Sequence, residues 1–217
     1  INKLKDGGIN FDENNINPIS PEDAMKFGAI SDKNPAFENM VDKHIAPGLF
    51  TSPNLKDRQQ VGMAYLTQFG GYTPEISAGI VANLTAESGM NPLVDAGGSE
   101  NSTGLAQWNA AVGRRQQLEK FTGYNFEDYS KTTAGEYFAS GPGGLGQLRF
   151  LRAELDGDIP GGDAGAVRAG TRFAAKPTMT AAEAATVFMT EFENPKDQSA
   201  AKIQGRVNKT AGILRDF

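Results

Sequence analysis

From about Asn54 onward, apolar residues recur at the three- and four-residue spacing of an amphipathic helix, and glycine or proline ends most of the runs. The first run places Val61, Tyr65 and Phe69 on one face and stops at Gly70-Gly71. Further helices are predicted over 73–88, 114–121, 144–155, 180–195 and 197–217. No segment alternates between apolar and polar residues as a strand would, so the sequence predicts a mainly α fold.

Several of these helices carry recognisable end signals. Thr73 is the predicted N-cap of its helix, with Pro74 at the first helical position. Thr180 and Glu183 form a predicted capping box, and that helix should end at 194–195, an Asn-Pro pair. The predicted apolar faces of the helices over 144–155 and 197–217 contain Leu148, Leu151 and Leu155, and Ile203, Val207, Ala211 and Leu214 respectively.

Residues 1–52 differ from the rest because they are rich in Asn, Asp, Gly and Pro. We interpret them as an extended N-terminal arm or linker, with one short helix over 21–28 capped by Ser20. Residues 53–217 are then the folded domain, which contains a long Gly/Ser/Asp-rich loop at 89–103.

Charge and apolar content exclude some partners. The net charge is −5 without a basic cluster, which argues against nucleic acid or an anionic membrane as the main partner. No apolar run approaches the roughly 20 residues of a membrane span.

The chain has no cysteine and a single histidine, His44, with no motif around it. Cys–His and Ser–His–Asp hydrolases need a histidine base, and catalytic zinc sites usually take two or three histidines. We therefore expect no metal and no cofactor, and carboxylate chemistry if the chain is an enzyme.

Glu87 is the foremost candidate. Ile76, Ile80, Leu84 and Glu87 fall on nearly one line of the predicted helix, which puts a carboxyl group on its apolar stripe. Glu87 also lies in the last turn, where the helix dipole is negative. Both effects favour the protonated acid, the form that a general acid needs. The alternative is a side chain that turns out to solvent at a frayed helix end.

The residues that follow carry a resemblance. "ESGMNP", residues 87–92, is followed by "GLAQW", residues 104–108. This resembles the E-S-x-x-N-P … G-L-M-Q signature of lytic transglycosylases and goose-type lysozymes. With "NLTAES" at 83–88 and "FENP" at 192–195, the chain is most similar to the phage tail lysozyme family of virion-associated muramidases. The resemblance covers about residues 55–200 and implies a lysozyme-like helical domain with a small loop or hairpin lobe.

The resemblance also implies roles for the matched residues. Glu87 would be the general acid, and Ser88 would hydrogen-bond the substrate near its N-acetyl group. Gly104 would let the backbone approach the sugar, and Gln107 would line the cleft. Trp108, the only tryptophan, is either a sugar-stacking platform or a core anchor, and the core position is the commoner one.

Three neighbouring features leave alternatives open. Asn83 lies one turn before Glu87 and either orients it or is solvated. Phe192 and Glu193 of "FENP" are interpreted as structural residues that close a helix. Tyr137 begins "YFASGPGG", a loose echo of the Tyr-Asn-Ala-Gly stretch of lytic transglycosylases that lacks the Asn and lies close after Glu87.

Hydrolysis by a glycosidase usually needs a second carboxylate, and the 89–103 loop offers Asp95 and Glu100. Either could place or activate water, or both could be solvated loop charges. Without such a partner, substrate-assisted transglycosylation with Glu87 alone becomes the better reading.

These features predict a muramidase that cuts the β-1,4 bond between N-acetylmuramic acid and N-acetylglucosamine in peptidoglycan glycan strands. The resemblance implies a virion protein that acts in the host cell wall or periplasm, with the arm as a possible tether to other virion proteins. The alternatives are a lytic transglycosylase on the same bond, or an inactive lysozyme-like module that binds peptidoglycan or serves as a virion part.

The histidine count generates a first testable prediction. We expect both His44→Ala and treatment with EDTA to leave the release of soluble fragments from purified cell walls unchanged, because carboxylate chemistry needs neither group. Inactivation by EDTA that zinc reverses would point instead to a metal hydrolase.

Overall fold

The computed structural model describes residues 54–68, 70–94, 101–123 and 143–217. Its elements are, in chain order, α5 (Leu55–Gln68), α6 (Pro74–Ser88), η2 (Ala110–Val112), α7 (Arg114–Thr122), α9 (Gly143–Asp156), α10 (Ala164–Ala175), α11 (Ala181–Val187), η4 (Phe188–Glu193) and α12 (Ala200–Asp216). The mainly helical prediction is confirmed, and no strand occurs in the described ranges beyond a single bridge between Thr103 and Trp108. The predicted helix at 21–28 lies outside the described residues.

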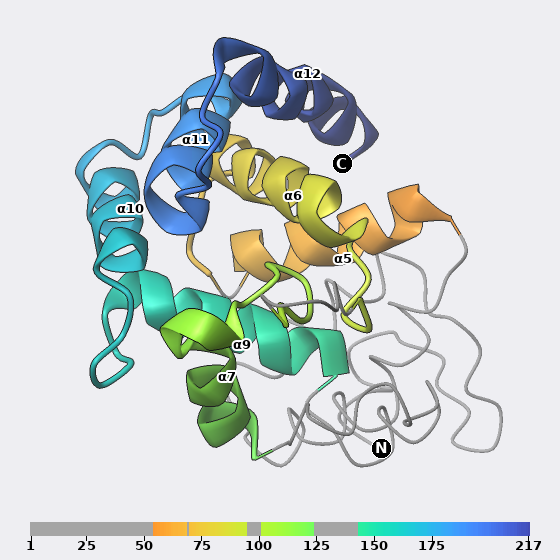
Figure 1. Cartoon of the computed structure of the whole chain (residues 1–217). Helices are drawn as coiled ribbons and strands as arrows, with labels where there is room; N and C mark the ends of the chain where they lie inside the picture. Colours follow the sequence, from red (N-terminus) through yellow and green to blue (C-terminus); the bar gives the residue numbers. More distant parts are fainter. Residues whose placement is uncertain (1–53, 69, 95–100, 124–142) are drawn as a thin grey trace, which may run out of the picture.

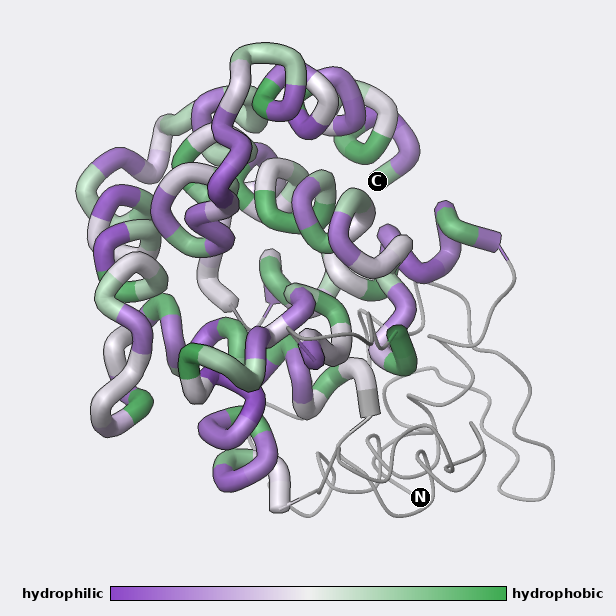
Figure 2. The backbone as a smooth tube through the Cα atoms, in the orientation of Figure 1, coloured by the Kyte–Doolittle hydropathy of each residue, from purple (hydrophilic) through white to green (hydrophobic). Residues whose placement is uncertain are grey.

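Helix α6 is the central element of the domain (Figure 1). It packs against α5, α11 and α12, and all of its residues from Ile76 to Leu84 are buried. The Thr73 side chain accepts the Ile76 N–H and Pro74 opens the helix, as predicted. Small residues make up much of α6, and Figure 2 shows a largely apolar or neutral helix surrounded by helices with hydrophilic outer faces.

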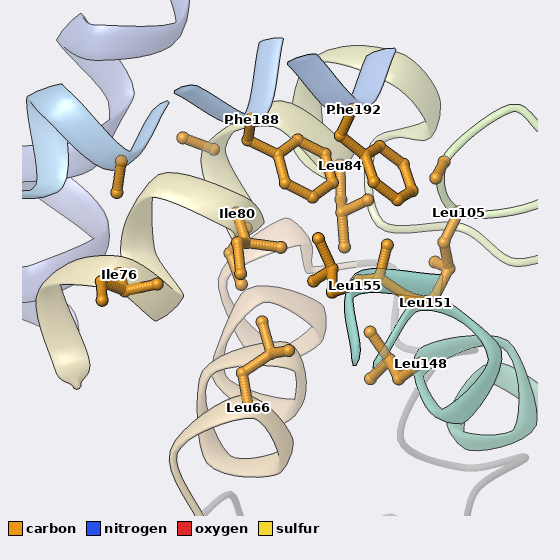
Figure 3. Packing of buried hydrophobic residues seen from close by; sticks show 14 of the residues in the cluster. Leu66, Ile76, Ile80, Leu84, Leu105, Leu148, Leu151, Leu155, Phe188 and Phe192 are labelled. Carbon is orange, nitrogen blue, oxygen red and sulfur yellow. The ribbon is translucent and has the colours of Figure 1, made fainter. Parts of the chain in front are cut away.

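The core lies where α6 meets α5, α9 and the α11–η4 segment (Figure 3). Leu66 from α5, Ile80 and Leu84 from α6, and Phe188 from η4 are fully buried there. The predicted face of α9 is confirmed, since Leu148, Leu151 and Leu155 all belong to this core.

Two elements depart from the sequence prediction. Helix α10 was not predicted, although Asp163 caps it by accepting the Ala166 N–H. In α12 the predicted apolar face is partly wrong: Ala211 is exposed, whereas the buried residues are Thr210 and Ile213. The face of α12 that points to the core is therefore not the predicted one. Arg206, one turn before Thr210, lies on the same face as the buried residues.

Helices α6 and α11 approach closely at Gly79. A Cβ atom built there would lie 2.6 Å from the Ala184 Cβ and 2.6 Å from the Ala185 N atom. Asn83, one turn further along α6, donates to the Ala185 carbonyl at 3.0 Å. The missing side chain of Gly79 thus sets the distance between these two helices.

No helix in these described ranges is long and apolar enough to cross a membrane.

The close approach at Gly79 can be tested by its effect on stability. We expect Gly79→Ala to lower the free energy of unfolding by about 1–3 kcal/mol, because an overpacked contact forces the helices apart. Gly205→Ala is the matched control, since a Cβ there meets nothing within 4 Å and alanine should raise stability by about 0.5–1 kcal/mol. Denaturant unfolding of both variants measures the difference, and equal effects would contradict this account.

Candidate active site

Glu87 lies in the last turn of α6, at the point where the helix leaves the core. Gly89 ends the helix in the left-handed conformation, with φ of 63°. Ile76, Ile80 and Leu84, on the same line, are buried, but the side chain of Glu87 keeps 27 % of its surface exposed. The helix thus carries this carboxyl group from an apolar stripe to the protein surface.

The partner of Glu87 is a cation that the sequence did not indicate. Arg206 of α12 forms an ion pair with Glu87 Oε1 through its Nη2 atom. The same Nη2 atom lies 3.4 Å from Oε2 of Glu193. Arg206 therefore bridges two carboxyl groups that are far apart in the sequence.

Glu193 is the last residue of η4 and the Glu of "FENP". Its side chain is only 6 % exposed. The preceding turn, 188–193, is a π-helix, and Asn194 ends it with a left-handed φ of 43°. A π-helical turn takes up one residue more than an α-helical turn and so changes the direction in which the following side chains point. Here it turns Glu193 toward α6 and α12.

The contacts of Glu193 determine its protonation. Burial raises its pKa to about 8, and the nearby charge of Glu87 acts in the same direction, while Arg206 lowers the pKa less strongly. At neutral pH Glu193 holds a proton beside the ion-paired Glu87.

The helix contact at Gly79 aligns these two carboxyl groups. Glu87 follows Gly79 by a little over two turns of α6. Glu193 follows Ala184, the residue packed on Gly79, by a similar length of chain that includes the π-helical turn. The site is thus assembled by helix packing rather than by a local motif.

A second, buried network of polar contacts supports the site. Arg114 of α7 makes two hydrogen bonds to Glu154 of α9, both 2.9 Å, and donates to the Phe192 carbonyl at 3.0 Å. Its guanidinium also lies 4.2 Å from the centre of the Phe192 ring. Trp108 donates to Glu154 at 2.6 Å. This network fixes the residue directly before Glu193.

The network decides the role of Trp108, which is fully buried against Phe150. In this structure Trp108 packs as a core residue. Asn83 is also fully buried, with its amide on the Gly79 and Ala185 carbonyls. It is neither solvated nor available to a sugar, and its role is to join α6 to α11.

The "GLAQ" turn has a structural basis. Gly104, with φ of 78°, has no room for a side chain because a Cβ atom would lie 2.5 Å from Gln147 Oε1. That oxygen accepts the Leu105 N–H, and the Gln147 amide donates to the Pro92 carbonyl. Gln107 donates to the Val94 and Gly104 carbonyls. The turn is thereby tied to the chain that follows Glu87.

Of the remaining predicted residues, Ser88 is 8 % exposed and donates to the Leu84 carbonyl. Gln107 is partly exposed, so it stays a candidate for substrate contact. Asp95, Glu100 and Tyr137 lie outside the described residues, as does His44.

A pocket of about 670 Å³ lies elsewhere, between α10, α11 and α12. The carboxylate in its lining, Glu183, is committed to the predicted capping box with Thr180. Hydrogen bonds from Lys176 and Thr180 lower the pKa of Glu183 to about 2. The carboxyl group in the lining of this pocket is therefore held in its ionised form. In the described part of the chain, no group of three or more His, Asp or Glu side chains could hold a metal ion.

A helical domain that presents one partly exposed carboxyl group, backed by a buried protonated carboxyl group and an arginine, has a site suited to general acid–base chemistry. The comparison with known families agrees with this class. The family model "Phage tail lysozyme" matches residues 57–217, and the chain belongs to that family. This membership indicates a lysozyme-like, peptidoglycan-degrading function in association with the phage particle. No curated protein and no solved structure matches the chain.

The network under Phe192 generates a stability prediction. We expect Arg114→Leu to lower the free energy of unfolding by about 3–5 kcal/mol, because it leaves the buried Glu154 carboxylate without its cation. Lys176→Met removes an ion pair whose side chains are 51 % and 47 % exposed and should leave the melting temperature close to that of the wild type. Thermal unfolding followed by circular dichroism distinguishes them, and two similar melting temperatures would refute the buried-pair account.

Proposed function

We propose that the protein is a muramidase that cleaves the β-1,4 bond between N-acetylmuramic acid and N-acetylglucosamine, with Glu87 as the general acid. The observation that carries this proposal is the position of Glu87, whose carboxyl group is partly exposed at the end of a buried helix and bridged by Arg206 to a second carboxyl group. Family membership supports the substrate class.

In this reaction the carboxyl group of Glu87 donates a proton to the glycosidic oxygen as the bond from that oxygen to the anomeric carbon breaks. Water then supplies a hydroxyl group to the anomeric carbon, and the proton left from that water restores the acid. Gln107 is a candidate to contact the sugar from the turn that is tied to residues 92–94.

Asp95 and Glu100 remain our candidates for placing the attacking water. Glu193 is not suited to that task, because its side chain is buried and Arg206 bridges it to Glu87. A water-activating carboxylate in an inverting glycosidase must lie about 6.5–9.5 Å away, across the sugar from the acid.

The family supports a setting for this activity. We propose that the protein is carried by the virion and degrades the host cell wall locally, with residues 1–52 as a tether to other virion proteins.

The proposed function predicts the effect of Glu87→Gln. Glutamine keeps the shape of the side chain but cannot donate a proton in this way, so turnover on purified sacculi should fall by about 10²–10⁴-fold with an unchanged melting curve. Glu75→Gln, on the exposed first turn of the same helix, is the matched control and should retain wild-type turnover.

Mass spectrometry of the released fragments tests the reaction type in the same assay. Reducing-end products support the muramidase, whereas 1,6-anhydro products would replace it with a lytic transglycosylase. Wild-type lysis by Glu87→Gln would refute the assignment of the acid, and absence of any glycan cleavage by the wild type would refute the proposed function.

A further inference from the structure

The Glu87–Arg206 ion pair raises a chemical problem for a general acid. The inference that follows rests on the proposed function. A general acid must carry a proton when the substrate binds, but a carboxyl group in contact with a guanidinium is stabilised in its ionised form. Glu87 faces the Arg206 guanidinium directly, so a second group that can hold a proton would serve this site.

The second carboxyl group supplies what Glu87 lacks. The Oε1 atom of Glu193 is buried, and no N–H or O–H donor among the residues that the structure describes reaches it. The Nη2 atom of Arg206 contacts Oε2 of Glu193 and Oε1 of Glu87, so the two carboxyl groups meet at one guanidinium. A buried carboxylate oxygen without a donor is costly, so a proton on this pair of carboxyl groups is favoured.

Burial decides which of the two carries it. The side chain of Glu193 is 6 % exposed and that of Glu87 is 27 % exposed, so a negative charge loses more hydration on Glu193. Arg206 lies closer to Glu87 than to Glu193, which also favours the charge on Glu87. The proton therefore rests on Glu193.

We infer that Glu193 is a positioning residue that holds the catalytic proton and passes it to Glu87 when Glu87 protonates the glycosidic oxygen. In this step the O–H bond of Glu193 breaks and its proton passes to the Glu87 carboxylate. Glu87 gives that same proton to the departing sugar oxygen and becomes a carboxylate again. Glu193 is left as a carboxylate beside Arg206. The proton released from the attacking water then restores the pair.

The other charged groups around the pair have partners of their own. Arg114 of α7 is held by Glu154 and the Phe192 carbonyl, and Arg58 of α5 donates to the Gly89 carbonyl at 3.1 Å. The charges that act on the Glu193 carboxyl group are those of Glu87 and Arg206. The pair and Arg206 should therefore determine how the activity depends on pH.

The direction in which activity depends on pH follows from the protonation of Glu193. The pKa of Glu193 is raised to about 8, so the pair keeps its proton below this pH and loses it above. We expect wild-type turnover to fall as the pH rises through about 8. This loss at high pH is the basic limb of the pH profile.

Two variants should move the basic limb in opposite directions. In Glu193→Gln the stored proton is gone, so the limb should shift down by about two pH units or more, with turnover at about pH 7 reduced tenfold or more. In Arg206→Gln the pair keeps its proton more tightly without the cation, so the limb should shift up. Arg206→Lys retains the positive charge and should restore the limb toward its wild-type position.

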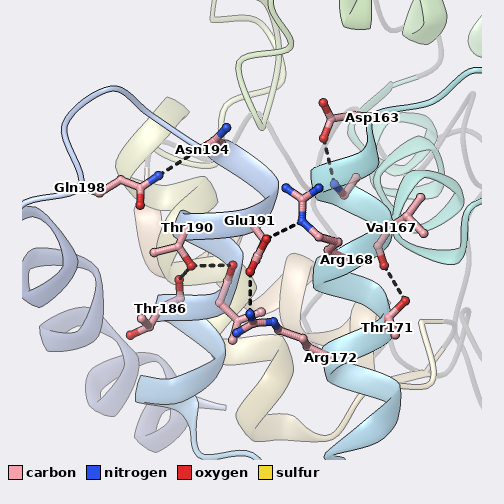
Figure 4. A network of polar contacts seen from close by, with 12 residues as sticks. Asp163, Val167, Arg168, Thr171, Arg172, Thr186, Thr190, Glu191, Asn194 and Gln198 are labelled. Carbon is pink, nitrogen blue, oxygen red and sulfur yellow. Dashed lines mark hydrogen bonds and ion pairs between the residues drawn. The ribbon is translucent and has the colours of Figure 1, made fainter.

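The matched control is Glu191→Gln, two residues before Glu193. Glu191 points to the other side of η4 and pairs with Arg168 and Arg172 of α10 (Figure 4). Its loss should lower thermal stability without moving the basic limb. A purely structural role for Glu193 predicts the same result for Glu193→Gln, namely reduced turnover at every pH with the limb unmoved, and that result would overturn the inference.

A ¹³C NMR titration of the Glu193 carboxyl group tests the stored proton without an activity assay. We expect a midpoint near the value of about 8 in the wild type and a lower midpoint in Glu87→Gln, because that variant removes the neighbouring negative charge. A midpoint in the ordinary range of glutamate would overturn the inference even if Glu193→Gln failed to fold. Absence of glycan cleavage together with a midpoint near 8 would instead refute the proposed function and leave the proton-holding pair standing.

Discussion

The close contact between α6 and α11 at Gly79 is the constraint on which the site depends. A side chain at Gly79 would overlap Ala184 and Ala185, and Asn83 adds a buried hydrogen bond between the same two helices. This contact fixes the spacing of the helices. Their ends, which carry Glu87 and Glu193, are thereby brought to one place, where Arg206 of α12 closes the group. The candidate site is therefore formed by helix packing.

A buried network of polar contacts fixes the end of η4. Arg114 connects Glu154 and the Phe192 carbonyl, and Trp108 binds the same Glu154 carboxylate. A buried ion pair of this kind adds little stability by itself, but it is costly to break because each partner would be left unpaired. It therefore keeps the "FENP" segment in one conformation. The tryptophan after the "GLAQ" motif is part of this buried network.

The active-site hypothesis is based on the two carboxyl groups that Arg206 bridges. The more exposed group, Glu87, can reach a substrate, whereas the more buried group, Glu193, can keep a proton at neutral pH. Two carboxyl groups whose surroundings differ in this way are a common means of dividing acid and base roles. Membership of the phage tail lysozyme family indicates a lysozyme-like, peptidoglycan-degrading function.

The sequence by itself determined the local structure: the helix periods, the Thr73 and Thr180 caps, the α9 core face and the carboxyl group at the end of α6. It determined these because each depends on residues a few positions apart. The tertiary structure alone decided that Arg206 faces inward, that Glu193 joins Glu87 and that Trp108 and Asn83 are buried. Those facts depend on how α12 is rotated about its axis and on the π-helical turn at 188–193. Packing between segments that are distant in the sequence determines both features, and no local pattern predicts them.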